Sequence, residues 1–146
     1  MATRRVSEVM TPDVEIVRPS DSLRVAAEKM RALNVGPIPV CDGDELVGIV
    51  TDRDIVVRAV AQGLDMERTQ VAQAMTRGVE SVYDDDDLTQ AAQKMRASRI
   101  RRILVLNRDK RLVGILSLGD IAAELSDQES GRTLEEVSAP SQPAAH

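Results

Sequence analysis

The chain has 146 residues, 42% of them hydrophobic, so it is long enough for one compact domain or two very small ones, and wholesale disorder is excluded. It has no Phe or Trp and a formal net charge of −5, which argues against a base-stacking surface and against a protein that binds the nucleic-acid backbone. Its only histidine is His146 and its only cysteine is Cys41, so the sequence predicts no Ser-His-Asp or Cys-His catalysis, no histidine-rich metal site and no internal disulfide.

Internal repetition dominates the sequence. Residues 6–55 align with residues 71–121, with one extra residue in the second copy near Lys110, and the tetrapeptide Leu-Val-Gly-Ile occurs at the same place in both copies. We therefore expect one structural unit used twice, as repeat 1 over residues 1–65 and repeat 2 over residues 66–125.

Each repeat is predicted to contain the elements β-α-β-β-α, an α+β arrangement within the α/β class. In repeat 1, the residues from Ser20 to Ser22 are candidate N-caps, and Leu23, Met30 and Leu33 belong to one apolar helical stripe. Asp42-Gly43-Asp44 is a turn signal between two strands. In chain order we expect a helical turn at 7–10, an extended stretch at 15–18, a helix at 22–33, strands at 37–41 and 46–51, and a helix at 52–61.

Repeat 2 shows the same order of elements, followed by a segment of different composition. A three-stranded sheet with two such helices is too small to close a core, so we expect the repeats to cover each other's helical faces as a face-to-face pair. Residues 126–146 are rich in Ser, Glu, Pro, Ala and Gln and are predicted to be a flexible tail; the alternative is that Leu134 and Val137 dock on a partner subunit. The elements of repeat 2 are expected at 80–83, 88–98, 102–106, 112–116 and 118–125.

A hydroxyl followed three residues later by Asp marks the end of the third strand in both repeats. Repeat 1 has Thr51 and Asp54, and repeat 2 has Ser117 and Asp120. At the start of a helix the free N–H groups suit an anion, a hydroxyl can donate to a phosphate, and a carboxylate can accept from two vicinal ribose hydroxyls. The alternative is that these residues only cap the helices, because Thr and Ser are good N-caps and Asp suits the first turn.

Three other features have plainer interpretations. The acidic run from Asp84 to Asp87 precedes a predicted helix, where the dipole favours acidic residues, and it lacks EF-hand spacing, so we expect no metal site there. Cys41 ends an apolar strand and is predicted to be a small buried hydrophobe, with a redox sensor as the alternative. No apolar run approaches the roughly 20 residues of a membrane span, and the N-terminus has no signal-peptide core, so we expect a cytoplasmic protein with no membrane partner.

Two short motifs recur in the same order in both repeats: Met10-Thr11-Pro12 with Met75-Thr76, and an ending in which Gly, two apolar residues and Thr or Ser are followed three residues later by Asp. Repeat 1 also has the strand from Val35 to Val40. Together these motifs resemble a pair of CBS domains, the cystathionine-β-synthase-type repeats that form a Bateman module. The likeness covers residues 5–125. The stretch Thr51 to Val56 with Gly63 to Asp65 is similar to stand-alone bacterial CBS-pair proteins, including hypoxic-response proteins.

The resemblance implies a fold and a ligand. The two repeats would pack as a pseudo-twofold pair, and the clefts between them would bind an adenosine-containing ligand such as AMP, ADP, ATP or S-adenosylmethionine. Arg53 would be available for a phosphate charge in repeat 1, at a position where repeat 2 has Gly119. By the family pattern, ribose hydroxyls would be bound by Asp54 and Asp120, and phosphate or ribose would be contacted by Thr51 and Ser117. The base would be flanked by Gly36, Pro37, Ile38 and Pro39 and by Arg102, Ile103 and Leu104. The opposite wall would be lined by Thr11 and Thr76.

These features predict a regulatory module rather than an enzyme. It would bind an adenosyl ligand and signal to an effector protein in trans, because we expect no effector domain in this chain, and it would form a homodimer through its helices. The alternative is a ligand-free structural or protein-interaction homodimer of the stress-response type. The missing cation at Gly119 favours this alternative for repeat 2.

Overall fold

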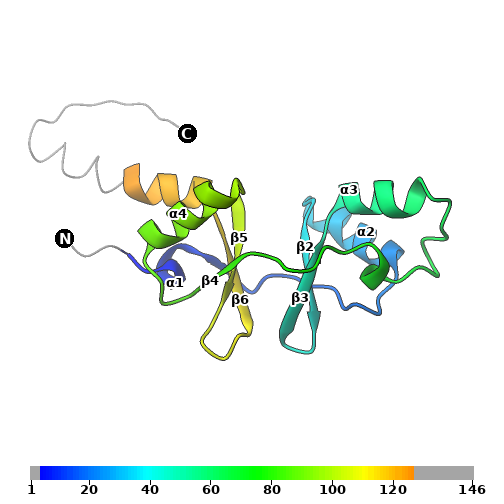
Figure 1. Ribbon diagram of the computed structural model, residues 1–146, viewed down its shortest axis with the longest axis horizontal. Helices are drawn as coiled ribbons and strands as arrows, with labels where there is room; N and C mark the ends of the chain where they lie inside the picture. Colours follow the sequence, from blue (N-terminus) through cyan, green and yellow to red (C-terminus); the bar gives the residue numbers. More distant parts are fainter. Residues whose placement is uncertain (1–3, 127–146) are drawn as a thin grey trace, which may run out of the picture. The chain divides into compact units, whose positions relative to one another are not determined.

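The computed structural model describes residues 4–126, which form two compact units (Figure 1). Apart from its first residue, the predicted tail at 126–146, with Leu134 and Val137, lies outside the described residues. In described residues, unit A comprises 14–80 and 110–112, and unit B comprises 4–13, 81–109 and 113–126.

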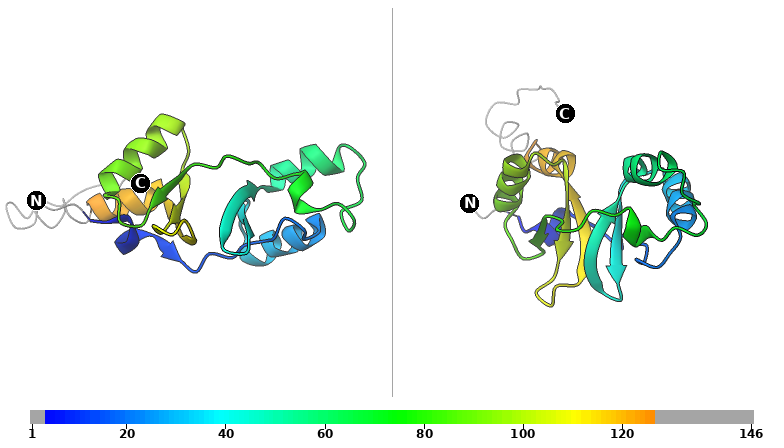
Figure 2. Two further views of the ribbon diagram at one scale, coloured as in Figure 1. Left: turned by 60° about the horizontal axis from the view of Figure 1, so that its bottom comes forward. Right: turned by 45° about the vertical axis from the view of Figure 1, so that its right-hand side comes forward.

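Unit B contains a four-stranded mixed sheet. Its elements are α1 (Val6–Val9), β1 (Thr11–Pro12), β4 (Ser81–Tyr83), α4 (Leu88–Ser98), β5 (Arg102–Leu106), β6 (Leu112–Ser117) and a helical segment at 118–126. The strand order is β1-β6-β5-β4, with β1 antiparallel to β6 and β4 parallel to β5. Helix α4 and the segment 118–126 lie on one face of this sheet (Figure 2) and share its hydrophobic core.

Unit A repeats this arrangement with two strands and two single bridges in place of four strands. Its elements are α2 (Leu23–Leu33), β2 (Ile38–Asp42), β3 (Glu45–Val50), α3 (Asp52–Ile55), the π-helix η1 (Val56–Val60) and the 3-10 helix η2 (Val71–Gln73). The strands β2 and β3 form an antiparallel ribbon, and α2 and α3 cover one face of it (Figure 1). Single bridges join Val17 in parallel to Val40 and Thr76 in antiparallel fashion to Ile49. Thr76 and Val17 therefore take the places that β1 and β4 have in unit B.

Each unit has its own hydrophobic core, and each core contains residues from the beginning of the other repeat. Val6 is fully buried in unit B with Leu88 and Leu116, and Val71 is fully buried in unit A with Leu23. The exchanged segments supply the apolar surface that one sheet and two helices lack. Helices α2 and α4 pack on the sheets of their own units. The compact units thus differ from the sequence repeats at the beginning of each repeat.

The element order β-α-β-β-α is confirmed in repeat 2, where α4 and β5 have the predicted bounds, and in repeat 1 the order α-β-β-α follows a single bridge. Helix α2 begins after Ser22, whose Oγ accepts from the Val25 N–H at 3.2 Å, and it ends at Asn34 with a left-handed φ of 56°. The predicted extended stretch at 15–18 is wrong as a strand, because only Val17 makes a bridge. The next N–H, that of Arg18, donates to Asp21 Oδ2 at 2.9 Å, which takes it out of any ladder.

Candidate functional site

The N-terminus of α3 carries a reciprocal pair of hydrogen bonds. Thr51 Oγ1 accepts from the Asp54 N–H at 3.0 Å, and Asp54 Oδ2 accepts from the Thr51 N–H at 3.0 Å. The Asp54 side chain is 16% exposed, and its Oδ1 lies 4.0 Å from Nε of Arg58. The capping role considered from the sequence is therefore present, and one carboxylate oxygen lies outside the cap.

The segment from Gly36 to Pro39 runs beside this cap. The Asp52 N–H donates to the Gly36 carbonyl at 3.2 Å, and a Cβ added at Gly36 would lie 3.1 Å from Asp52 Oδ1. A side chain at this position would therefore press on the start of α3. Pro37 is half-buried, whereas Ile38 and Pro39 are buried, and Ile38 belongs to the core of unit A. Ile38 thus offers a ligand its backbone rather than its side chain.

Thr76 lies on the other side of β3 from this segment. Its N–H and carbonyl pair with those of Ile49 at 2.8 and 2.9 Å, and the residue is exposed. The sequence left open which repeat supplies which wall, and the structure places Thr76 in the same unit as Asp54. We refer to Thr51, Asp54, Gly36–Pro39 and Thr76 as the Asp54 cluster.

Unit B contains an equivalent set of residues. Ser117 Oγ accepts from the Asp120 N–H at 3.0 Å, and Asp120 Oδ2 accepts from the Ser117 N–H at 3.3 Å. The Leu118 N–H donates to the Arg101 carbonyl at 2.8 Å, which is the counterpart of the bond between Asp52 and Gly36. Ile103 and Leu104 are buried and Thr11 and Arg102 are exposed. The Asp120 cluster comprises Ser117, Asp120, Arg102, Ile103, Leu104 and Thr11, the last of which pairs with Ile115 of β6.

The cation beside Asp54 is not Arg53, the residue that the sequence offers for a phosphate charge. Arg53 is exposed, and its backbone N–H donates to Asp52 Oδ1 at 3.0 Å. Arg58 instead contacts Asp54 and also the carbonyls of Ala74 and Met75, each at 3.2 Å from Nη1. The four-residue spacing from Asp54 was the sequence signal for Arg58, because residues i and i+4 meet on a helix.

The acidic run from Asp84 to Asp87 pairs with Arg108, which lies in the loop between β5 and β6. Asp85 accepts from Arg108 at 2.8 Å, and the guanidinium of Arg108 lies 4.0 Å over the ring of Tyr83. The hydrogen bond from Arg108 lowers the pKa of Asp85. Within residues 4–126, no three His, Cys, Asp or Glu side chains are grouped so that they could hold a metal, and no helix is long and apolar enough to cross a membrane.

Cys41 is buried, with 2% of its surface exposed, and burial followed by the charge of Asp44 raises the pKa of its thiol. A raised pKa leaves less thiolate at neutral pH, and the thiolate is the nucleophile. We expect alkylation of native Cys41 by iodoacetamide at neutral pH to be at least about tenfold slower than in the guanidinium-unfolded chain. Mass spectrometry of timed samples measures both rates, and equal rates would favour the redox-sensor alternative.

The comparisons with known proteins agree with this geometry. The family model of the CBS domain matches residues 6–60 and 71–127. The chain is 37% identical over 134 residues to the CBS domain-containing protein YhcV of Bacillus subtilis, covering 91% of this chain and 94% of YhcV. It is 33% identical over 128 residues to Hypoxic response protein 1 of Mycobacterium tuberculosis, covering 87% of each chain.

Solved structures with the same fold include ligand complexes. Hypoxic Response Protein I, with two coordinated zinc ions, has a TM-score of 0.73 and 31% identity, over 82% of this chain and 98% of that one. CBSX2 in complex with AMP has a TM-score of 0.73 and 27% identity, over 86% and 98%. The CBS domain pair of MJ0100, with 5′-methylthioadenosine and S-adenosylmethionine, has a TM-score of 0.70 and 27% identity, over 87% and 99%. The two repeats, their strand-to-helix junctions and these matches together show that the chain belongs to the CBS domain family and carries a pair of CBS domains.

Proposed function

We propose that the chain is a non-catalytic regulatory module that binds an adenosine-containing ligand at the Asp54 and Asp120 clusters and signals to a partner protein in trans. The observation that carries this proposal is the repeated junction of hydroxyl and carboxylate at a helix N-terminus, next to a threonine on the neighbouring strand. The relatives with AMP and with S-adenosylmethionine support this ligand class. A cytoplasmic location remains our prediction.

The chemistry of the Asp54 cluster suits a ribose. A carboxylate has about four lone-pair positions, and the cap occupies one of them on Asp54 Oδ2, so vicinal hydroxyls have acceptors to bind. Thr51 Oγ1 already accepts from the Asp54 N–H, which leaves its own proton to donate to a ligand oxygen. In this proposal the backbone from Gly36 to Pro39 flanks the base, and Arg53 is the candidate for a phosphate contact.

The Asp120 cluster has the same acceptors with a different cation. Gly119 replaces Arg53, so a phosphate at this cluster has Arg102, exposed at the start of β5, as its candidate partner. Ile103 and Leu104 are buried, so we assign them backbone contacts with the base.

A ligand-free interaction module is the second candidate function. The capping bonds account for Thr51 and Asp54 without a ligand. The helix after them exposes a stripe of large apolar side chains, with Val56 56%, Val57 49% and Val60 55% exposed. Such a stripe is suited to self-association, and we therefore propose a homodimer in both candidate functions.

Titration calorimetry with AMP on the Asp54→Ala and Asp54→Asn variants separates the two candidates. Asp54→Ala is expected to weaken AMP binding at one site at least tenfold and to cost about 1 kcal/mol of stability through the lost cap. Asp54→Asn can still accept from the Thr51 N–H, so its stability stays near that of the unmodified chain while its affinity falls.

The equivalent changes at Asp120 provide the internal control for the second cluster. If Asp54→Ala lowers the unfolding midpoint but binds AMP as tightly as the unmodified chain, the residue only caps the helix. Failure of the unmodified chain to bind AMP, ATP and S-adenosylmethionine would favour the ligand-free interaction module.

A further inference from the structure

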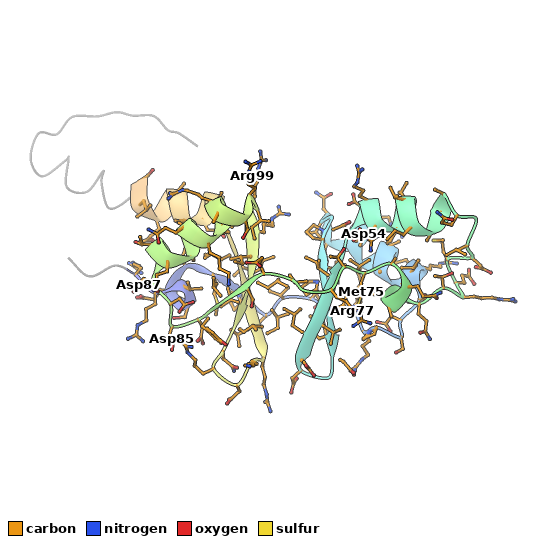
Figure 3. The ribbon with its side chains drawn as sticks, viewed as in Figure 1. Asp54, Met75, Arg77, Asp85, Asp87 and Arg99 are labelled. Atoms are coloured by element: carbon orange, nitrogen blue, oxygen red, sulfur yellow. The ribbon has the colours of Figure 1, made fainter. Side chains whose placement is uncertain are left out.

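One arginine connects the two walls of the Asp54 cluster. Arg58 lies one helical turn after Asp54, with its Nε 4.0 Å from Asp54 Oδ1 and half of its side chain exposed. Its Nη1 donates to the carbonyls of Ala74 and Met75 at 3.2 Å each. A single guanidinium thus contacts the carboxylate on α3 and the last two carbonyls before Thr76. Figure 3 labels Asp54 and Met75, the residues that Arg58 joins.

These carbonyls stand at the end of a helical turn, where backbone acceptors need a partner. The 3-10 helix η2 ends at Gln73, and the chain then leaves it to pair Thr76 with Ile49 of β3. A guanidinium presents several N–H donors in a fixed plane, so one Arg can satisfy both carbonyls and still face a carboxylate. Arg58 therefore fixes the place at which the connecting segment turns into the strand position of Thr76.

The second repeat lacks this connection. The residue one helical turn after Asp120 is Glu124, and its Oε2 lies 2.8 Å from Nε of Arg4. Glu124 has no donor for the carbonyls that precede Thr11, and its charge has the same sign as that of Asp120. The two clusters are alike in their caps and strand pairing but differ in this one tie.

We propose that Arg58 is a positioning residue for the Asp54 cluster: it holds Asp54 and Thr76 in one arrangement, so that ligand affinity at this cluster depends on it. This inference rests on the proposed function for its ligand. Without Arg58, every residue that we expect to contact the ligand is still present. The segment that leads to Thr76 must then become ordered at the moment when the ligand binds. Ordering a segment at the moment of binding lowers affinity.

The test compares Arg58→Ala with Arg58→Lys and with Arg24→Ala. Arg24 ties the same connecting segment to α2, at 2.6 Å from Glu67 Oε1, but lies outside the Asp54 cluster. Lysine keeps the charge beside Asp54 and has a single ammonium for the carbonyls. All variants are made in the Asp120→Ala background, so that an AMP titration reports on the Asp54 cluster.

Two measurements are made on each protein. In Arg58→Ala we expect amide hydrogen exchange of Thr76 to be at least about tenfold faster while that of Thr11 is unchanged, and AMP affinity to fall about tenfold. Arg58→Lys is expected to lie between Arg58→Ala and the parent protein in both measurements. Arg24→Ala is expected to keep the affinity of the parent.

The outcomes separate the inference from the proposed function. Unchanged Thr76 exchange in Arg58→Ala would overturn the inference, as would faster exchange with unchanged AMP affinity, or an equal loss of affinity in Arg24→Ala. If the unmodified chain binds no AMP, the proposed function fails and the affinity effect of Arg58 fails with it. Thr76 exchange would then still decide whether Arg58 holds this segment.

Discussion

Replacing Val71 by Asp is expected to unfold unit A, although Val71 lies at the beginning of repeat 2. Its side chain is fully buried among Leu23, Val40 and Val50. A carboxylate at this place has no cation or donor in the core, so we expect a loss of about 3–5 kcal/mol, a large part of the stability of a small domain. Chemical denaturation followed by circular dichroism measures the loss.

The milder variants Val71→Ala and Val6→Ala show which core each residue supports. We expect each to cost about 1–3 kcal/mol, because a buried side chain is shortened and leaves a cavity. Amide hydrogen exchange should show lost protection at Val40 in Val71→Ala and at Val105 in Val6→Ala, since these residues lie in the corresponding cores.

A surface valine provides the matched control for these changes. Val25 of α2 is 37% exposed and lies outside the stripe of Val56, Val57 and Val60, so Val25→Ala should change stability by no more than about 0.5 kcal/mol. If Val71→Ala instead lowered protection at Val105 and left Val40 unchanged, the cooperative parts of the molecule would be the sequence repeats rather than units A and B.

Replacing Gly48 by Ala is expected to destabilise the chain and to weaken ligand binding together. An added Cβ would lie 2.7 Å from the carbonyl oxygen of Thr76 and 3.0 Å from Sδ of Met75. The Thr76 carbonyl accepts from the Ile49 N–H at 2.9 Å, so it can move away only by breaking this pairing. We expect a cost of about 1–3 kcal/mol, which outweighs the gain of up to about 1 kcal/mol from removing a glycine in a strand.

The equivalent position in unit B is as tight, and a nearby glycine serves as control. A Cβ on Gly114 would lie 2.9 Å from the Thr11 carbonyl oxygen, whereas a Cβ on Gly119 meets only Ser117 Oγ, at 3.7 Å. We expect Gly114→Ala to destabilise the chain and Gly119→Ala to be neutral or stabilising, because alanine favours the helix. Thermal unfolding and an AMP titration measure both effects. A Gly48→Ala protein that matches the parent in both would show that Thr76 has room to shift.

The sequence predicted the parts of the fold that depend on near neighbours along the chain. Helix α4 and β5 follow from apolar spacing and turn residues, and the junctions at Thr51 and Ser117 follow from capping chemistry. The repeat is visible when the two halves of the sequence are aligned, and it predicted one type of unit in two copies. The resemblance to CBS domains rested on the same local motifs, and the family is confirmed.

The features that sequence reasoning missed all join segments far apart in the chain. Val17 makes one bridge to Val40 instead of a strand, Arg58 reaches the carbonyls of Ala74 and Met75, and Gly48 lies against Thr76. Apolar patterning shows that Val6 and Val71 are buried, but it carries no information on which of two similar cores receives them. Because the repeats are alike, either core accepts either segment by composition.

By itself, then, the sequence determined the type of unit, its duplication and the residues that cap its helices, since these depend on contacts within a few residues. Only the tertiary structure decided that Thr76 joins the Asp54 cluster and Thr11 the Asp120 cluster, and that Arg58 ties one of them and not the other. The physical reason is that these choices are made by the pairing of distant backbone segments and by the space beside glycines. Neither is encoded in any single stretch of the chain.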